Sequence, residues 1–363
     1  MKIKQVKTYH VQAPVTEKFA NSGMWNTSRG AHIVEVIADN GLIGWGEGSE
    51  ALKPSALDSL VIGRSPFDCA AIWQALYENK ISPRAISGLD IALWDLMGKA
   101  LEIPIYELLG GAVRRTIPAY ASGLFCKDCP DVTGALVDEA KSYVDLGFPA
   151  MKMKVGFGEV YDVKNVTAVR RAIGDDILFA VDANCAYDVA TAIDVGRKMM
   201  HNDLLWYEEP ILSDDVRGYL EIKQALGLRI AGAEALAGRW AFRELIQQRA
   251  LDIVQPDISI AGGFTECRIV AGMASANYIR ILPHMWGGQI RLAATVHWQA
   301  TLPDWPKVLH PFPSLFEYDM TENALRTDLA RNPIQARDGE LHLPTEPGLG
   351  IEIDRDVLHK YRV

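Results

Sequence analysis

The 363-residue chain has few cysteines and no long run of apolar residues. The cysteines are an odd, scattered set, and the single CxxC pair has neither a second pair nor the spaced histidines of a zinc site. They are Cys69, Cys126, Cys129, Cys185 and Cys267. Free thiols in a reducing compartment are therefore expected.

The apolar stretches are too short for a membrane span, which needs about 18 uninterrupted apolar residues. The start, MKIKQVKTYHV, is charged and alternating, and it lacks the apolar centre of a secretory signal. The sequence therefore predicts a cytoplasmic protein with no membrane partner.

Positive charge is scarce as well, because 37 Lys and Arg residues face 46 Asp and Glu residues and leave a net charge of -9. A chain of this charge repels phosphate backbones, so nucleic acid is not an expected partner. The composition is otherwise that of a globular protein with ample core, with 49% hydrophobic residues. At about 100–200 residues per domain, the length allows two or three domains, or one barrel with an attachment.

The first 50 residues alternate in hydrophobicity and predict strands, with a hairpin turn at Asn40-Gly41. From about Ser55 to Leu109 the apolar residues recur at helical spacing. Strands followed by helices predict a separate α+β unit.

From about Ile117 short apolar strands alternate with amphipathic helices, one at 160–173 and another capped by Asp188. The predicted strands cover 150–155, 178–184, 204–210, 229–234, 251–257 and 279–284. Six to eight such units in roughly 210 residues fit a (β/α)8-type barrel, with an open doubly wound sheet as the alternative. The domains expected are residues 1–116, 117–334 and a segment of short strands and turns, 335–363, that packs back on the first unit.

Polar residues that are costly to bury stand at the ends of these strands. They are Lys152, Lys154, Asp182, Asn184, Glu208, Glu234, Asp257 and His284. The intervals from Lys154 through the acids to His284 are 28, 26, 26, 23 and 27 residues, about one βα unit each. Because the carboxyl ends of barrel strands meet at one mouth, we expect these side chains to converge there.

Three carboxylates in one confined mouth would repel one another, so a cation is expected between Asp182, Glu208 and Glu234. Oxygen ligands favour Mg²⁺, with Mn²⁺ possible. Each acid alone would more often be a helix cap or an ion-pair partner. Only the regular spacing, which places all three at the ends of successive strands, favours a metal site. Glu209 points to the other side of the strand and is interpreted as a supporting residue.

Lys152 and Lys154 share one face of a strand, where each ammonium group is expected to lower the pKa of the other and prepare a base. Asp257 and His284 lie on neighbouring strands, the usual arrangement for a histidine acid or base. The alternatives are an edge strand with exposed lysines and a structural histidine. A metal flanked by a lysine and a histidine suits removal of a proton next to a substrate carboxylate.

At this point the chain resembles the enolase superfamily and, within it, the mandelate racemase-like subgroup (the mandelate racemase/muconate lactonizing enzyme family). The matching motifs are KMKVG at 152–156, VDAN at 181–184, YEEP at 207–210, GAE at 232–234, QPDISIAGG at 255–263 and PHMWG at 283–287. The resemblance implies an α/β fold, a modified (β/α)7β TIM-type barrel with an α+β capping domain built from both termini. Ala233 is a departure, because glycine is common there.

The resemblance also implies roles. Lys154 is a base with Lys152 as its neighbour, the three acids hold Mg²⁺, and Asp257–His284 is the second acid/base. Glu317 would contact the substrate carboxylate. Asn184 and the capping residues Asn21 and Trp25 are further candidates for substrate binding, and the capping loops near 19–25 and Glu47 would set specificity.

The predicted reaction is β-elimination on an acid sugar or its lactone, as in the dehydratase and galactarolactone cycloisomerase branch, through an enediolate. Racemisation or epimerisation of a 2-hydroxy acid is the alternative. A Schiff-base aldolase using a barrel lysine and a non-catalytic binding protein are more distant alternatives. The partners expected are a small carboxylate substrate and further copies of the chain, as a dimer or octamer.

Overall fold

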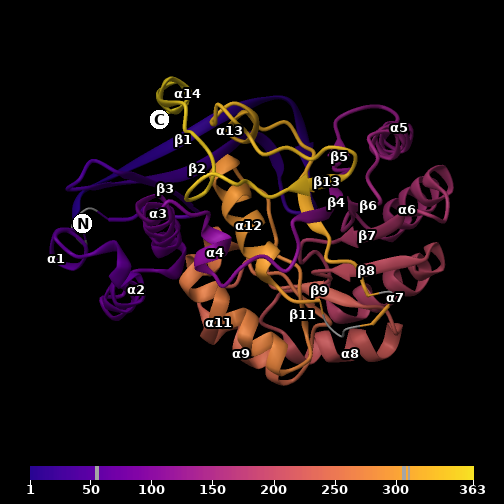
Figure 1. Cartoon of the computed structure of the whole chain (residues 1–363). Coiled ribbons are helices and arrows are strands. Elements are labelled where there is room, and N and C mark those ends of the chain that lie inside the picture. The colour runs from indigo at the N-terminus through magenta and orange to yellow at the C-terminus, as the bar shows by residue number, and fades with distance from the viewer. Residues whose placement is uncertain (54–56, 305–307, 310) are drawn as a thin grey trace.

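The computed structural model describes residues 1–53, 57–304, 308–309 and 311–363. The predicted helical stretch therefore begins, at Ser55, outside the described residues. Figure 1 shows two parts side by side, an antiparallel sheet with helices on the left and a barrel on the right.

The first part is the capping domain. Its strands are β1 (Ile3–Ala20), β2 (Trp25–Ala38) and β3 (Ile43–Gly48), joined as β3-β2-β1-β5, with β5 at Cys126–Lys127. Its helices are α1 (Leu57–Leu60), a 3-10 turn at Pro66–Asp68, α2 (Cys69–Glu78), α3 (Pro83–Leu101) and α4 (Ile105–Leu108). The hairpin predicted at Asn40-Gly41 is confirmed, because β2 and β3 pair in antiparallel register on either side of it.

Helix α3 packs under the sheet at very short range. A Cβ on Gly46 of β3 would lie 1.8 Å from the carbonyl oxygen of Gly88, so glycine is required for this approach. Asp95 of α3 then accepts N–H groups from Trp45 and Leu349, both at 2.8 Å. This one buried carboxylate joins the helix to the sheet and to the C-terminal segment.

The second part is the barrel, in which the described residues form eight parallel strands in the order β11-β10-β9-β8-β7-β6-β4-β12. The strands are β4 (Thr116–Gly123), β6 (Ala150–Lys154), β7 (Leu178–Asp182), β8 (Leu204–Glu208), β9 (Ile230–Gly232), β10 (Ile253–Val254), β11 (Arg280–Ile281) and β12 (Phe316–Asp319). The predicted barrel is confirmed and the doubly wound alternative is wrong.

Helices follow the barrel strands in turn. They are α5 (Val132–Asp145), α6 (Glu159–Ile173), α7 (Val189–Met199) with a 3-10 turn at Met200–Asn202, α8 (Val216–Leu226), α9 (Arg239–Gln247), α10 (Ile258–Ala261), α11 (Gly263–Ala276), α12 (Gln289–Thr301) and α13 (Ala324–Thr327). The helix predicted at 160–173 is α6. The Asp188 cap is confirmed, because its carboxylate accepts the N–H of Thr191 at 2.7 Å.

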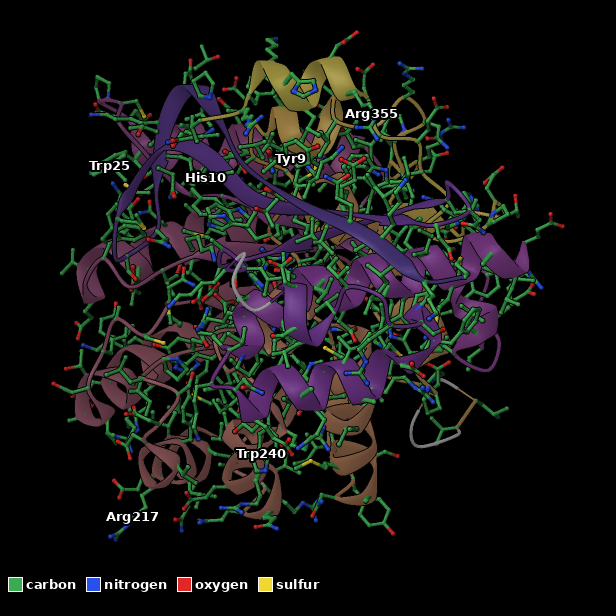
Figure 2. All side chains as sticks on the ribbon, turned by 90° about the vertical axis from the view of Figure 1, so that its left-hand side faces the viewer. Tyr9, His10, Trp25, Arg217, Trp240 and Arg355 are labelled. Atoms are coloured by element: carbon green, nitrogen blue, oxygen red, sulfur yellow. The ribbon has the colours of Figure 1, made fainter. Side chains whose placement is uncertain are left out.

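The last segment contacts the capping domain, where Arg362 bridges Val11 of β1, and it is not only strands and turns. It contains β13 (Glu340–His342), which pairs with barrel strand β4, and α14 (Arg355–Lys360), which Figure 1 shows above the sheet. Figure 2 places Tyr9 of β1 below Arg355, and both side chains contact Glu35. Over the described residues, no helix combines the length and apolar character needed to cross a bilayer.

Candidate active site

Three acidic side chains meet at the carboxyl end of the barrel. Asp182 and Glu208 are the last residues of β7 and β8, and Glu234 follows the end of β9 by two residues. One oxygen from each lies within 4.8 Å of the others. Asp182 and Glu208 are fully buried. The convergence predicted from the residue spacing is therefore present in the structure.

The backbone is strained where the chain leaves these strands. Asn184 and Cys185 after β7, Glu209 after β8 and Ala233 after β9 all have positive φ, from 37° to 79°. Side chains with a Cβ rarely adopt this conformation. Such strain collects at functional sites, where it directs neighbouring side chains. The alanine at 233 stands where φ is 79°, which explains why glycine suits the position.

Glu208 is held from several sides. Its Oε2 accepts hydrogen bonds from Trp206 Nε1 and Gln255 Nε2, each at 2.8 Å, and its Oε1 contacts Lys152. Burial raises its pKa to about 8. Glu209 lies outside the cluster, and its carboxylate accepts the N–H of Ala233 at 3.2 Å. This arrangement agrees with the interpretation of Glu209 as a supporting residue.

The two lysines point into the same cluster. Lys154 contacts Asp182, and Lys152 Nζ lies 2.8 Å from Glu317 Oε1. Burial lowers the pKa of both ammonium groups, but the neighbouring carboxylates raise it more, so both pKa values are raised. Lys152 does lower the pKa of Lys154, as predicted, but the prediction of a net decrease is wrong because the acids outweigh the second lysine.

Glu317 comes from the last strand, β12, and joins the same cluster. Its carboxylate accepts hydrogen bonds from Ser122 Oγ at 2.7 Å and from the N–H of Met285 at 3.0 Å. Burial raises its pKa, but Lys152 lowers it more, so it is held below its usual range. Lys152 thus joins Glu317 to the metal-ligand candidates, and a contact between Glu317 and the substrate stays a prediction.

His284 closes the other side of the mouth. Its Nδ1 lies 2.6 Å from Asp257 Oδ2, and its Nε2 lies 3.4 Å from Glu234 Oε2. Lys154 therefore touches the Asp182 end of the acidic row and His284 touches the Glu234 end. Their strands, β6 and β11, are separated by four others in the sheet. A substrate bound at the acids would have the amine on one side and the imidazole on the other.

Of the predicted substrate-binding residues, Asn184 lies beside the acidic cluster, whereas Asn21 and Trp25 belong to the capping domain. Asn184 donates its N–H to Asp182 Oδ1 at 2.8 Å, while its own Oδ1 is buried without a protein partner. Asn21 Oδ1 accepts the N–H groups of Gly23 and Met24 and so shapes the β1–β2 turn. Trp25, at the side of the view in Figure 2, is 44% exposed. Binding roles for these residues stay predictions.

A stack of aromatic and cationic side chains lies between the lysine and the histidine. Phe125 stacks on Trp286 with ring centroids 6.3 Å apart, and Lys154 Nζ lies 5.2 Å from the Phe125 centroid. The guanidinium of Arg29, from capping strand β2, lies 3.6 Å over Trp286.

Several of these residues were missed by sequence reasoning. Trp206 could have been found, because it alternates with Glu208 on one strand face, and Gln255 belongs to the QPD motif. They and the other missed residues are Ser122, Phe125, Trp206, Gln255, Trp286, Arg29 and Arg291. Arg29 carried no signal, since it reaches the site only through the packing of distant segments. Arg291 lies seven residues after His284, and the first turn of α12 brings its side chain back to the imidazole.

Glu47 was expected in a specificity loop, and the structure places it elsewhere. It is 2% exposed and binds the backbone at the start of α12.

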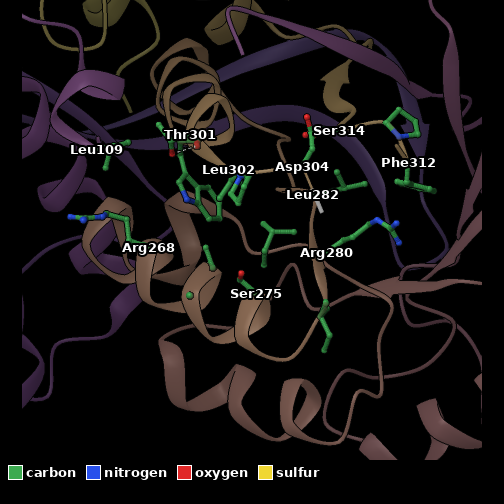
Figure 3. Close-up of a pocket in the computed structure, with 17 residues that line it drawn as sticks. Leu109, Arg268, Ser275, Arg280, Leu282, Thr301, Leu302, Asp304, Phe312 and Ser314 are labelled. Carbon is green, nitrogen blue, oxygen red and sulfur yellow. Dashed lines mark hydrogen bonds between the residues drawn. The ribbon is translucent and has the colours of Figure 1, made fainter. Parts of the chain in front are cut away.

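A separate cavity of about 300 Å³, shown in Figure 3, lies near the start of β11 and the end of α12. Arg280 and Thr301 line it, so it belongs to the opposite end of the barrel from His284.

Comparison with known proteins agrees with this geometry. Residues 6–110 match the N-terminal domain of mandelate racemase and muconate lactonizing enzyme, and residues 135–357 match the enolase C-terminal domain-like family. D-galactarolactone cycloisomerase of Agrobacterium fabrum is 34% identical over 100% of this chain and 99% of its own length. Arabinonate dehydratase of Saccharolobus solfataricus is 32% identical over 91% of each chain.

Solved structures give the same result. The 3,6-anhydro-D-galactonate cycloisomerase of Zobellia galactanivorans is 35% identical, covers 100% of both chains and superposes with a TM-score of 0.88. A racemase of Streptomyces coelicolor with bound magnesium is 28% identical, with 99% and 100% coverage and a TM-score of 0.87.

The fold and the cluster define an enzyme of the enolase superfamily, in which Mg²⁺-dependent chemistry is the norm. Within that superfamily, the chain belongs to the mandelate racemase/muconate lactonizing enzyme family, and its relatives lie in the acid-sugar branch.

Proposed function

We propose that this enzyme removes the proton next to the carboxylate of an acid sugar or acid-sugar lactone and then expels a β-oxygen, with Mg²⁺ as cofactor. The observation that carries the proposal is the placement of Lys154 and His284 at opposite ends of the Asp182–Glu208–Glu234 cluster. Two proton-transfer groups on opposite sides of one substrate can act as base and acid in turn.

The donor set fits Mg²⁺. Three carboxylates supply oxygen atoms only, and they come from the ends of three consecutive strands. Asn184 adds a buried, unpartnered amide oxygen beside Asp182. A bound Mg²⁺ would supply positive charge next to the substrate carboxylate and would compensate the mutual repulsion of the three acids. Mn²⁺ suits the same oxygen ligands.

The chain's own residues would then move the protons. One of Lys154 and His284 takes the α-proton, and the C–H electron pair moves toward the substrate carboxylate to give an enediolate. The enediolate then forms the double bond to the β-carbon. The bond from the β-carbon to oxygen breaks, and the other group protonates the departing oxygen. The enol product then takes a proton at carbon to give the keto acid. Where that oxygen belongs to a ring, the ring opens and no water is lost.

Charge pairing in the site favours a substrate with one free carboxylate. The Arg29 guanidinium lies 3.0 Å from Asp319, and Arg291 pairs with Asp257. Both cations are thus already neutralised by acids of the site. We therefore propose an aldonate, an anhydro-aldonate or a monolactone in preference to an open diacid. The named relatives act on galactarolactone, arabinonate and 3,6-anhydro-galactonate.

Racemisation is the second candidate, because the same opposed pair can deliver a proton to either face of the α-carbon. The magnesium-bound Streptomyces relative is named a racemase. A Schiff-base aldolase is disfavoured, since that chemistry needs no metal and leaves the Asp182–Glu208–Glu234 cluster without a role.

Proton NMR in D₂O tests the proposal, with a panel of aldonates, sugar lactones and open diacids and Mg²⁺ present. We expect a new keto-deoxy product from a substrate with one carboxylate, and no product after EDTA treatment. Loss of only the α-proton signal would establish racemisation instead. Full turnover in EDTA would exclude the metal, and preference for an open diacid would overturn the substrate class.

The cytoplasmic location and the homo-oligomer remain part of the proposal. The five cysteines, all free, are compatible with a reducing compartment. Size-exclusion chromatography with light scattering measures the oligomer directly.

A further inference from the structure

The capping domain reaches the catalytic loop through one buried carboxylate. Glu47, at the end of capping strand β3, accepts the N–H of Gly288 at 2.7 Å and the N–H of Arg291 at 3.1 Å. These N–H groups belong to the first turn of α12, which has no partner for them within the helix. Glu47 therefore caps a barrel helix from another domain.

The two glycines after Trp286 make this approach possible. A Cβ at Gly287 would lie 2.3 Å from Arg291 Cδ and 2.9 Å from Glu47 Oε1, and a Cβ at Gly288 would lie 2.7 Å from Glu47 Oε2. These separations are shorter than a side chain tolerates. The Gly-Gly pair thus leaves room for the Arg291 side chain and for the Glu47 carboxylate at the start of α12.

From that first turn, Arg291 extends back toward the histidine. Its guanidinium donates to the carbonyl oxygen of Trp286 at 3.1 Å, pairs with Asp257 Oδ2 and lies 3.4 Å from His284 Nδ1. Arg291 is 9% exposed. Burial lowers its pKa to about 10, a value at which it still carries its charge at neutral pH. Asp257 is thus shared between the imidazole and the guanidinium.

We propose that Arg291 is a positioning residue for His284, and that Glu47 makes its position depend on the seating of the capping domain. Arg291 and His284 share one oxygen of Asp257, so any shift of Arg291 changes where that oxygen lies and how the imidazole is oriented. The chain Glu47–Arg291–Asp257–His284 thus connects the domain that covers the site to one of its two proton-transfer groups. The catalytic consequence rests on the proposed function, whereas the orientation of the imidazole does not.

The test needs a variant that touches neither Asp257 nor His284. Glu47→Gln removes the charge that holds the start of α12 and leaves the dyad intact. Glu35→Gln is the matched control, because Glu35 is an equally buried carboxylate of the same sheet that binds Tyr9 and Arg355 instead. Arg291→Lys keeps the charge but not the fork geometry, and it serves as the second variant if Glu47→Gln does not fold.

The first readout is the proton NMR signal of the His284 Nδ1–H in the Mg²⁺-loaded enzyme, assigned by its loss in His284→Asn. We expect this signal to shift or disappear in Glu47→Gln and Arg291→Lys and to stay in place in Glu35→Gln. An unchanged signal in both Glu47→Gln and Arg291→Lys would overturn the proposal. An equal change in Glu35→Gln would also overturn it, because the effect would then be general loosening of the domain.

The second readout is kinetic and uses D-galactarolactone, or the substrate found in the NMR panel. We expect kcat to fall about 10-fold in Arg291→Lys with KM nearly unchanged, since the misplaced group acts on the imidazole. The double variant Glu47→Gln/Arg291→Lys should lose no more than the worse single variant. Additive losses would mean that the two residues act independently. If no substrate is turned over, the proposed function fails while the NMR result still stands.

Discussion

The two sides of the active site are built in different ways. The lysine side is anchored by barrel strands, because Lys152 and Lys154 contact acids on β7, β8 and β12. The capping domain reaches it less directly, through the stack that begins at Arg29. The histidine side depends on a second domain, since His284 is reached from Glu47 through α12. One proton-transfer group is therefore fixed chiefly by strand geometry, and the other by how two domains pack.

This difference teaches where control of the reaction can lie. Lys152 and Lys154 lie on β6, which is paired with a strand on each side, so their positions depend chiefly on the barrel. A loop capped by the other domain can respond to its seating. Sequence changes in the capping domain are therefore expected to affect the histidine side first.

The strongest test of the comparison removes each proton-transfer group in turn. Lys154→Met and His284→Asn are each expected to reduce kcat by about 10²–10⁴-fold, because each group handles one proton. Steady-state kinetics with the same substrate measures both. If either variant keeps more than about a tenth of the activity, a single group suffices and the two-sided description is wrong.

Asp90 offers a contact between the domains that lies away from the dyad. It lies on α3, accepts the N–H of Thr265 in α11 at 3.1 Å, and burial raises its pKa to about 7. Because the folded pKa exceeds the unfolded value of 3.8, its contribution is full below about pH 4 and is lost as the pH rises to about 7.

We therefore expect Asp90→Asn to gain stability relative to the wild type over this range, by up to about 4 kcal/mol. Urea unfolding at pH 4 to 8 measures the difference. A difference that does not change with pH would mean that Asp90 is ionised in the folded protein.

A substitution at Gln255 tests the lysine side of the site without changing His284. Gln255→Leu removes one of the two donors to Glu208 Oε2. We expect the Mg²⁺ concentration for half-maximal activity to rise about 10–100-fold, since groups that orient a ligand affect metal affinity to this extent. Gln299→Leu is the control, because Gln299 is equally buried but binds the carbonyl of Leu315 instead. Equal effects in both variants would exclude a specific role.

The smallest effect is expected at Ala233. Ala233→Gly removes the strain of a positive φ and should leave stability unchanged or raise it by up to about 1 kcal/mol. Ala231→Gly, two residues earlier on β9, should instead lower it by about 1 kcal/mol or more. Thermal unfolding of both variants measures the contrast. Destabilisation by Ala233→Gly would show that the backbone there is not strained.

The residue spacing along the chain was sufficient to predict that the three acids lie together at the barrel mouth. Asp182 and Glu208 fall on strand ends because one βα unit brings the chain back to the same height. The strand lengths were less accurate. The segments predicted at 229–234, 251–257 and 279–284 contain strands of only two or three residues. Glu234, Asp257 and His284 therefore lie in loops beyond them, where polar groups bind one another rather than a neighbouring strand.

The pKa of the lysines could not be obtained from the sequence. Two residues on one strand face predict mutual repulsion, and that effect is present at Lys154. The larger attraction comes from Asp182, Glu208 and Glu317, whose distances from the ammonium groups depend on how the barrel strands are arranged. Whether the net effect on the lysine pKa is an increase or a decrease can be decided only when the distances to all these charges are known.

The sequence by itself determined the fold, the acidic row and the identity of the groups that face it, because hydrophobic period and motif spacing are local properties of the chain. Tertiary structure alone decided which arginine reaches Asp257 and which backbone N–H groups Glu47 binds. Those contacts join residues more than 200 positions apart in the case of Glu47 and Arg291. Their energies depend on burial and distance, which no local pattern records.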